Sequence, residues 1–183
     1  RIDLLCHLVI LNSFDRVVDQ AKNICEETIF AVTGETKAPK AYRVLFLDAD
    51  NSLLGPMAQA IAQRNHPHSG HYSSAGQQAV DGFRDGLASF LEARGIDMMS
   101  ESPQILDPAA ELTNYHVIVS LQGTVRDYID RVPFATIALD WDVAGPLKAG
   151  TSEESTTQFE SLYRILAPQL QELMVTLRGE ERS

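Results

Sequence analysis

Residues 44–62 read VLFLDADNSLLGPMAQAIA, and this stretch decides what kind of fold the chain adopts. The apolar run at 44–47 predicts a buried strand, and the apolar positions after Pro56 predict a helix beyond a short polar loop. A strand, a tight turn and a helix N-terminus in this order direct free backbone N–H groups to one point, which attracts anions. The loop nevertheless offers two carboxylates, Asp48 and Asp50. Its function therefore depends on what these acids do.

Beyond residue 43, short apolar runs alternate with helical patterns. We predict strands at 43–48, 71–75, 115–121 and 134–139, and helices at 55–65, 82–94, 124–131 and 153–178. Strands separated by helices favour a parallel sheet that is covered by helices on both faces. The predicted fold class is therefore α/β, with a four-stranded parallel sheet.

The N-terminal part of the sequence has a different organisation. Apolar side chains recur at helical spacing through residues 1–33, and Gly34 and Pro39 end the pattern. We predict a long helix at 1–33, a linker at 34–42 and a domain at 43–183. Because the helical pattern begins at once with Arg1, we expect the chain to be a fragment of a longer protein.

Charge and cysteine content limit the partners. Residues 1–43 carry six basic and six acidic residues of the 15 and 25 in the chain, so the remainder holds nine against nineteen. This acidic balance argues against nucleic acid as a partner. No apolar run approaches the roughly 20 residues of a membrane span.

Cys6 and Cys25 lie too far apart on one helix to form a disulfide. We therefore expect both cysteines to be small core residues of a protein in the reducing cytoplasm.

The loop resembles the phosphate loop of the low-molecular-weight protein tyrosine phosphatase family, which includes arsenate reductases. That loop reads Cys, any residue, Gly, Asn, any residue, Cys, Arg, Ser, Pro, and residues 48–56 here read D-A-D-N-S-L-L-G-P. Similar motifs follow in the family's order, namely S-S-A-G at 73–76, F-L-E-A-R-G-I-D at 90–97, V-I-V-S-L at 117–121 and D-W-D-V-A-G-P at 140–146. The resemblance covers residues 43 to about 146 and implies a flavodoxin-like fold.

The catalytic positions of that family are replaced. Where the family has a nucleophilic Cys, a phosphate-binding Arg and an acidic Asp before Pro, this sequence has Asp48, Leu54 and Gly145. Loss of the nucleophile alone costs on the order of 10⁶ in rate. The resemblance thus implies a catalytically silent domain, unless Asp140 or Asp142 supplies the acid from a shifted position.

We predict that Asp48 itself occupies the anion site, so that the loop folds without ligand. Asp48 ends a buried strand, where an unpaired charge is costly. Asn51, Ser52 and Gly55 suit the turn, and Ser74 is expected to support the loop from the neighbouring strand. Alternatively, Asp50 or Asn51 is simply the N-cap of the helix.

A second resemblance offers a rival activity. VLFLDADNSLLG is similar to the first motif of haloacid dehalogenase-like phosphatases, D-x-D-G-T-L after a hydrophobic strand. That resemblance implies that Asp48 is a nucleophile and Asp50 an acid, with Mg²⁺ between them. Asn51 and Ser52 replace Gly-Thr, and Lys148 follows Asp140 and Asp142 where the family has Lys first. We rank this alternative second.

The helix at 1–33 resembles the last helix of the phosphate-uptake regulator (PhoU) family. The matching residues are Asp15, Asp19, Gln20, Ala21, Asn23, Ile24, Cys25 and Glu26. The family resemblance implies a metal site at Asp15 and Asp19, which lie on one helical face. The alternative is a solvated stripe eased by Arg16 and Lys22. Because residues 2–11 are apolar around most of the helix, we also predict a homodimer through this helix.

Together these resemblances imply a pseudophosphatase with a regulatory or protein-binding role in phosphate-responsive signalling, without a cofactor. The alternatives are an Asp48- and Mg²⁺-dependent phosphatase and residual tyrosine phosphatase activity.

Overall fold

The computed structural model describes residues 41–78, 80–98, 102–107, 112–143 and 152–178, and scattered positions between 14 and 32. The chain divides into two compact units, Arg1–Pro39 and Lys40–Ser183. The scattered positions of the first unit have helical backbone, and the rest of the predicted helix, with Asp15 and Asp19, lies outside the described residues. Cys25 is exposed, so its prediction as a core residue is wrong. The other described residues of this unit are exposed as well, so none of them covers the Cys25 side chain.

The second unit is built on a parallel four-stranded sheet, which confirms the predicted fold class. The strands are β1 (Tyr42–Asp48), β2 (Gly70–Gly76), β3 (Val117–Ser120) and β4 (Ile137–Asp140), in the order β2-β1-β3-β4. The central strand β1 is buried from residue 44 to residue 48, as its apolar run predicts. In the register of the sheet, Asp48 lies opposite Gly76. The carboxyl end of β1 therefore meets the end of β2.

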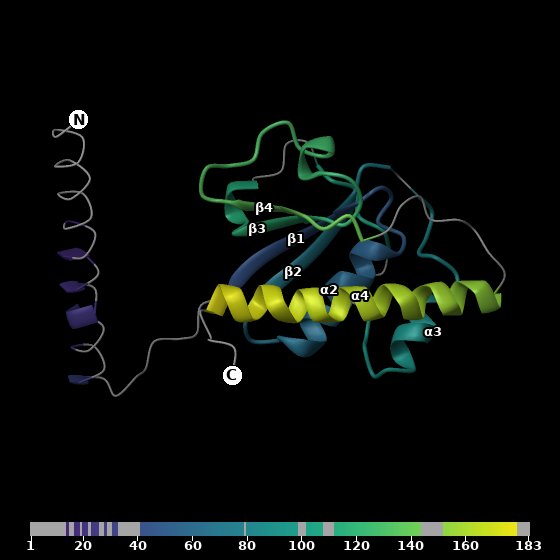
Figure 1. The fold of residues 1–183 in the computed structure, drawn as a ribbon, viewed down its shortest axis with the longest axis horizontal. Coiled ribbons are helices and arrows are strands. Elements are labelled where there is room, and N and C mark those ends of the chain that lie inside the picture. The colour runs from purple at the N-terminus through teal and green to yellow at the C-terminus, as the bar shows by residue number, and fades with distance from the viewer. Residues whose placement is uncertain are drawn as a thin grey trace. The chain divides into compact units, whose positions relative to one another are not determined.

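Two unequal cores cover the two faces of the sheet. The larger core contains α2 (Leu54–Asn65), α3 (Leu87–Glu92) and α4 (Ser152–Arg178), and α4 packs against both other helices (Figure 1). The smaller core on the other face lies under two 3₁₀-helices, η1 (Leu112–Asn114) and η2 (Val125–Asp127). The described helices on this second face are thus single turns.

Two predicted helices are shorter than expected. The helix predicted at 82–94 forms only at 87–92, because Gly86 has a left-handed φ of 82° and Arg84 donates its backbone N–H to Ser52. The helix predicted at 124–131 is the single turn η2, in which Thr124 and Asp127 form a reciprocal capping box. In the first place a hydrogen bond to the β1–α2 loop, and in the second a local capping box, replaces the continued helix.

Candidate functional site

The loop that connects β1 to α2 lies at the carboxyl end of the sheet, where open parallel sheets bind their ligands. Asn51 has a left-handed φ of 54° within this loop. A Cβ at Gly76 would lie 2.6 Å from the backbone nitrogen of Asn51, so only glycine allows this close approach. The end of β2 therefore supports the conformation of the loop.

The Asp48 carboxylate points back into the loop and is 1% exposed. Its Oδ1 accepts the backbone N–H of Asn51 at 2.6 Å. Its Oδ2 accepts the backbone N–H of Gly55, in the first turn of α2, at 2.9 Å. Both carboxylate oxygens are thus hydrogen-bonded to backbone donors of the kind that bind anions at helix N-termini.

Burial raises the pKa of Asp48 from 3.8 to about 6, because the charged form loses its hydration. The N–H groups of Gly55, Asn51 and Leu54 act in the opposite direction, while the nearby charge of Asp50 raises the pKa further. Near pH 7 the side chain is therefore mostly a carboxylate. The interior of the loop is negative under these conditions.

Hydrogen bonds to β2 and to the turn after β3 hold the loop in place. Asn51 is fully buried and donates its Nδ2 to the carbonyl oxygen of Ser74 at 3.3 Å. Ser74 thus contacts the loop through its backbone, while its hydroxyl donates to Gln59 of α2 at 2.7 Å. Gln122, which follows β3, accepts the N–H of Ala49 at 3.2 Å. Gln59 and Gln122 were not predicted as site residues from the sequence. The position of Gln122 just beyond a strand end could have indicated its place at the site.

The alternative interpretation of Asp50 as a helix cap is wrong. The N-cap position of α2 is Leu53, which makes no side-chain cap hydrogen bond. Asp50 instead accepts the N–H of Ser52 at 2.9 Å within the loop. The carboxylate that reaches the first turn of α2 is that of Asp48, because it comes from the preceding strand.

Leu54 and Gly55 stand where the sequence resemblance places an Arg and a Ser, and neither has a side chain that can hydrogen-bond to phosphate. Leu54 is fully buried in the larger core. Gly55 lies directly against Asn51, whose buried Oδ1 has no hydrogen-bond partner among the described residues. The family has a hydroxyl at the position of Gly55, which is the kind of donor that this oxygen lacks. Gly145, at the position of the family's acid, lies outside the described residues.

Asp140 and Asp142 are both engaged with the loop that follows β3. Asp140 accepts the N–H of Val125 at 2.7 Å, and Asp142 accepts the N–H of Gly123 at 3.0 Å. Burial, followed by the negative charge of Asp48, raises the pKa of Tyr128 to about 12, and Asp142 contributes in the same direction. Asp48 and Asp142 therefore lie near one tyrosine at this end of the sheet.

The residues of the described part of the chain form no group of three His, Cys, Asp or Glu side chains that could hold a metal ion. Asp15 and Asp19 fall outside that part, so their predicted metal site stays a prediction. Carboxylate oxygens of Asp48 and Asp50 accept hydrogen bonds from backbone N–H groups of the loop. This arrangement does not favour the Mg²⁺-dependent alternative, which needs both carboxylates at a metal.

Comparison with known proteins identifies the class of fold. No protein-family model matches the sequence, and no curated protein gives a significant match. Solved structures do match. A thioredoxin-dependent arsenate reductase of Corynebacterium glutamicum has 17% identity and a TM-score of 0.63, over 85% of this chain and 70% of that one. The fold is thus that of an arsenate reductase.

Phosphatases give similar values. The arginine phosphatase YwlE of Geobacillus stearothermophilus has 21% identity and a TM-score of 0.59, over 78% of this chain and 99% of that one. The tyrosine phosphatase Wzb of Escherichia coli K30, solved with sulphate, has 18% identity and a TM-score of 0.59, over 74% of this chain and 97% of that one. The second unit therefore has the fold that low-molecular-weight protein tyrosine phosphatases and arsenate reductases share.

Proposed function

We propose that the second unit is a catalytically silent phosphatase-fold domain with a regulatory or protein-binding role. The observation that carries this proposal is the Asp48 carboxylate, which accepts the N–H groups of Asn51 and Gly55. In this proposal Asp48 takes the place of a bound anion, and Asn51, Ser52 and Ser74 maintain the filled loop. No thiolate, guanidinium or hydroxyl side chain stands at positions 48, 54 and 55 to receive a phosphoryl group.

Electrostatics oppose the entry of phosphate. Two unit negative charges about 4 Å apart, at an effective dielectric constant near 20, repel each other by about 4 kcal/mol. This energy corresponds to roughly a thousandfold loss of affinity. An ionised Asp48 thus acts against phosphate through its charge and also through its use of the backbone donors.

Hydrolysis of an aryl phosphate tests the proposal directly. We expect no turnover by the chain, with or without Mg²⁺, and none by Asp48→Asn. Turnover that requires Mg²⁺ and disappears in Asp48→Asn would support the haloacid dehalogenase-like alternative instead.

Anion binding tests the filled loop separately. Calorimetry with millimolar inorganic phosphate should detect no binding to the unmodified chain. Asp48→Ala should acquire weak binding, because it frees the N–H groups of Asn51 and Gly55 and removes the charge. Asp50→Ala is the matched control, since it removes one carboxylate from the same loop but leaves those two donors occupied. Equal behaviour of the two variants would contradict the proposal.

The resemblance of the first unit to PhoU suggests that the regulation responds to phosphate in the cytoplasm. No helix in the described part of the chain is long and apolar enough to cross a membrane. Exposed apolar residues at described positions of this unit, including Phe14, Val18 and Ile24, support the proposed homodimer through the N-terminal helix. Sedimentation should show a dimer for the chain and a monomer after deletion of residues 1–33.

A further inference from the structure

Strand β4 is an edge of the described sheet, and its outer side has backbone groups without a hydrogen-bond partner among the described residues. Ile137 donates its N–H to His116, and Trp141 donates to Ser120, so both groups point toward β3. Successive residues of a parallel strand direct their backbone groups to alternate sides of the strand. The N–H and C=O groups of Ala138 and Asp140 therefore point away from β3. Among the described residues, no hydrogen bond to these outward groups is found. An unpaired edge of this kind can pair with another extended chain.

An apolar row lies along the same edge. Ile137, Leu139 and Trp141 share one face of β4, because side chains alternate along a strand. Leu139 and Trp141 are partly buried against the core under α4, and Trp141 also packs against the Phe46 ring, with ring centroids 6.4 Å apart. Ile137 is 51% exposed. Helix α4 therefore leaves the outer part of this row uncovered.

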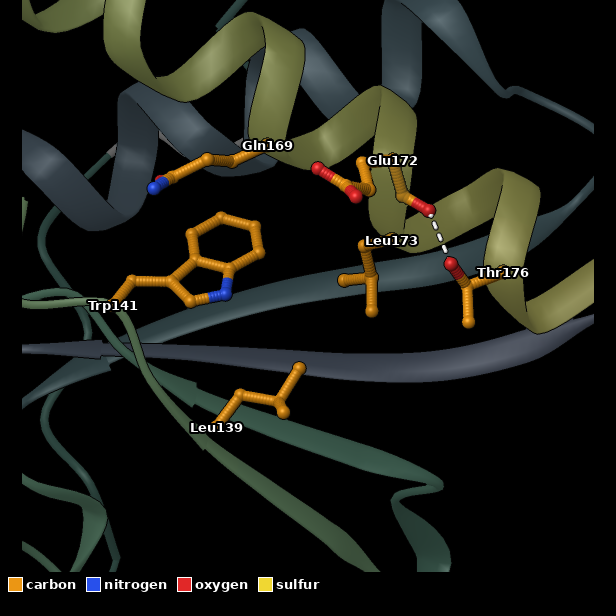
Figure 2. A pocket seen from close by; sticks show the side chains of 6 residues that line it. All are labelled: Leu139, Trp141, Gln169, Glu172, Leu173 and Thr176. Atoms are coloured by element: carbon orange, nitrogen blue, oxygen red, sulfur yellow. Dashed lines mark hydrogen bonds between the residues drawn. The ribbon is translucent and has the colours of Figure 1, made fainter. Parts of the chain in front are cut away.

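A pocket of about 310 Å³ opens between this row and α4. Figure 2 shows Leu139 and Trp141 on the strand side, facing four α4 residues, Gln169, Glu172, Leu173 and Thr176. The α4 residues lie on one face of the helix, since Glu172 and Leu173 are each three or four positions from both Gln169 and Thr176. The pocket thus has an apolar floor and a rim that contains the Glu172 carboxylate.

We propose that β4 binds an extended segment of another protein, in which apolar side chains alternate with lysine or arginine. The segment adds to the sheet as a fifth strand and hydrogen-bonds to the outward groups of Ala138 and Asp140. One apolar side chain enters the pocket beside Trp141, and the basic side chains lie on the opposite face of the sheet, on the side of Asp140. Main-chain pairing supplies affinity and the pocket supplies selectivity in this mode of recognition.

Charge decides between a heterologous segment and a second copy of β4. Pairing two β4 strands would bring together the Asp140 and Glu172 carboxylates of both copies, and each chain has a net charge of -10. Like charges across an interface disfavour association. A basic partner segment is therefore the occupant that this surface fits. The inference gives the proposed protein-binding role a surface, and it uses no residue of the β1–α2 loop.

Trp141 provides the measurement, because it is the only tryptophan in the chain. The probe is a peptide of about ten residues, long enough for one added strand, with alternating valine and lysine. We expect a saturable change in Trp141 fluorescence on titration of the full chain. A peptide of alternating valine and glutamate should produce none. Absence of a saturable change with the lysine peptide at millimolar concentration overturns the proposal.

Variants distinguish edge pairing from general charge attraction. Ala138→Pro removes the outward N–H without breaking the bonds to β3, and proline is tolerated at strand edges. Ala138→Thr is the matched control, because it keeps the N–H. We expect Ala138→Pro to abolish the fluorescence change and Ala138→Thr to keep it. Unchanged binding by Ala138→Pro would exclude edge pairing.

Sedimentation separates the remaining occupant, a second copy. The proposal expects Ala138→Pro to leave the oligomeric state unchanged. A dimer that dissociates in Ala138→Pro but not in Ala138→Thr would show that β4 pairs with itself, which contradicts a heterologous partner. Anion binding by the Asp48 variants is unaffected in either case, so failure here is distinct from failure of the silent-phosphatase proposal.

Discussion

The buried carboxylate of Asp48 should make the protein less stable as the pH rises from about 4 to 6. Its pKa is about 6 in the folded chain, against 3.8 as the ordinary value. The folded state therefore holds a proton that the unfolded state has released in this pH range. Since the free energy of unfolding falls with pH wherever the native state binds more protons, the contribution of Asp48 is fully present below about pH 4 and is lost through pH 6. The pKa difference corresponds to about 3 kcal/mol.

The substitution Asp48→Asn isolates this contribution. We expect the free energy of unfolding of the unmodified chain, relative to Asp48→Asn, to fall by about 3 kcal/mol between pH 4 and pH 7.5. The asparagine does not titrate, and both proteins contain the other carboxylates. The contributions of those carboxylates to the pH dependence of stability therefore cancel in the comparison. Near neutral pH the asparagine also removes a buried charge, but its amide donor must face one of the two N–H groups, which costs about 1–3 kcal/mol.

Urea denaturation at a series of pH values measures the difference. Asp50→Asn is the matched control, because it removes a carboxylate from the same loop. A relative stability that instead rises with pH would refute the reasoning. It would mean that the N–H groups of Asn51 and Gly55 stabilise the charged form by more than burial disfavours it.

Three substitutions test how the loop is supported, each by thermal or urea unfolding. Gly76→Ala should destabilise the fold by a few kcal/mol, because its Cβ would lie 2.6 Å from loop backbone, whereas Gly82→Ala, with nothing within 4 Å, should be nearly neutral. Ser74→Ala should cost about 1–2 kcal/mol, since it leaves the buried amide oxygen of Gln59 without its donor. Leu54→Arg should unfold or strongly destabilise the domain, and so should not restore phosphate binding, because the new charge would enter the core.

Local patterns predicted the regular elements better than the irregular ones. The apolar run 44–47 and the apolar periodicity after Pro56 identified β1 and α2 closely, because burial of a strand or helix imposes a period on the residues themselves. The predicted strand at 134–139 begins only at Ile137, since Thr136 closes a turn on Pro133. Such turns depend on a few hydrogen bonds that leave no periodic signal.

The sequence by itself determined the α/β class, the place of the loop and the presence of Asp48, Leu54 and Gly55 in it, because these follow from residue type and order. Only the tertiary structure decided what the loop contains. Asp48 and its donor Gly55 are seven positions apart, Ser74 comes from β2, and Gln122 comes from the turn after β3. Residue type says that a carboxylate can accept N–H groups, but which groups come within 3 Å depends on how separate strands converge at one edge of the sheet.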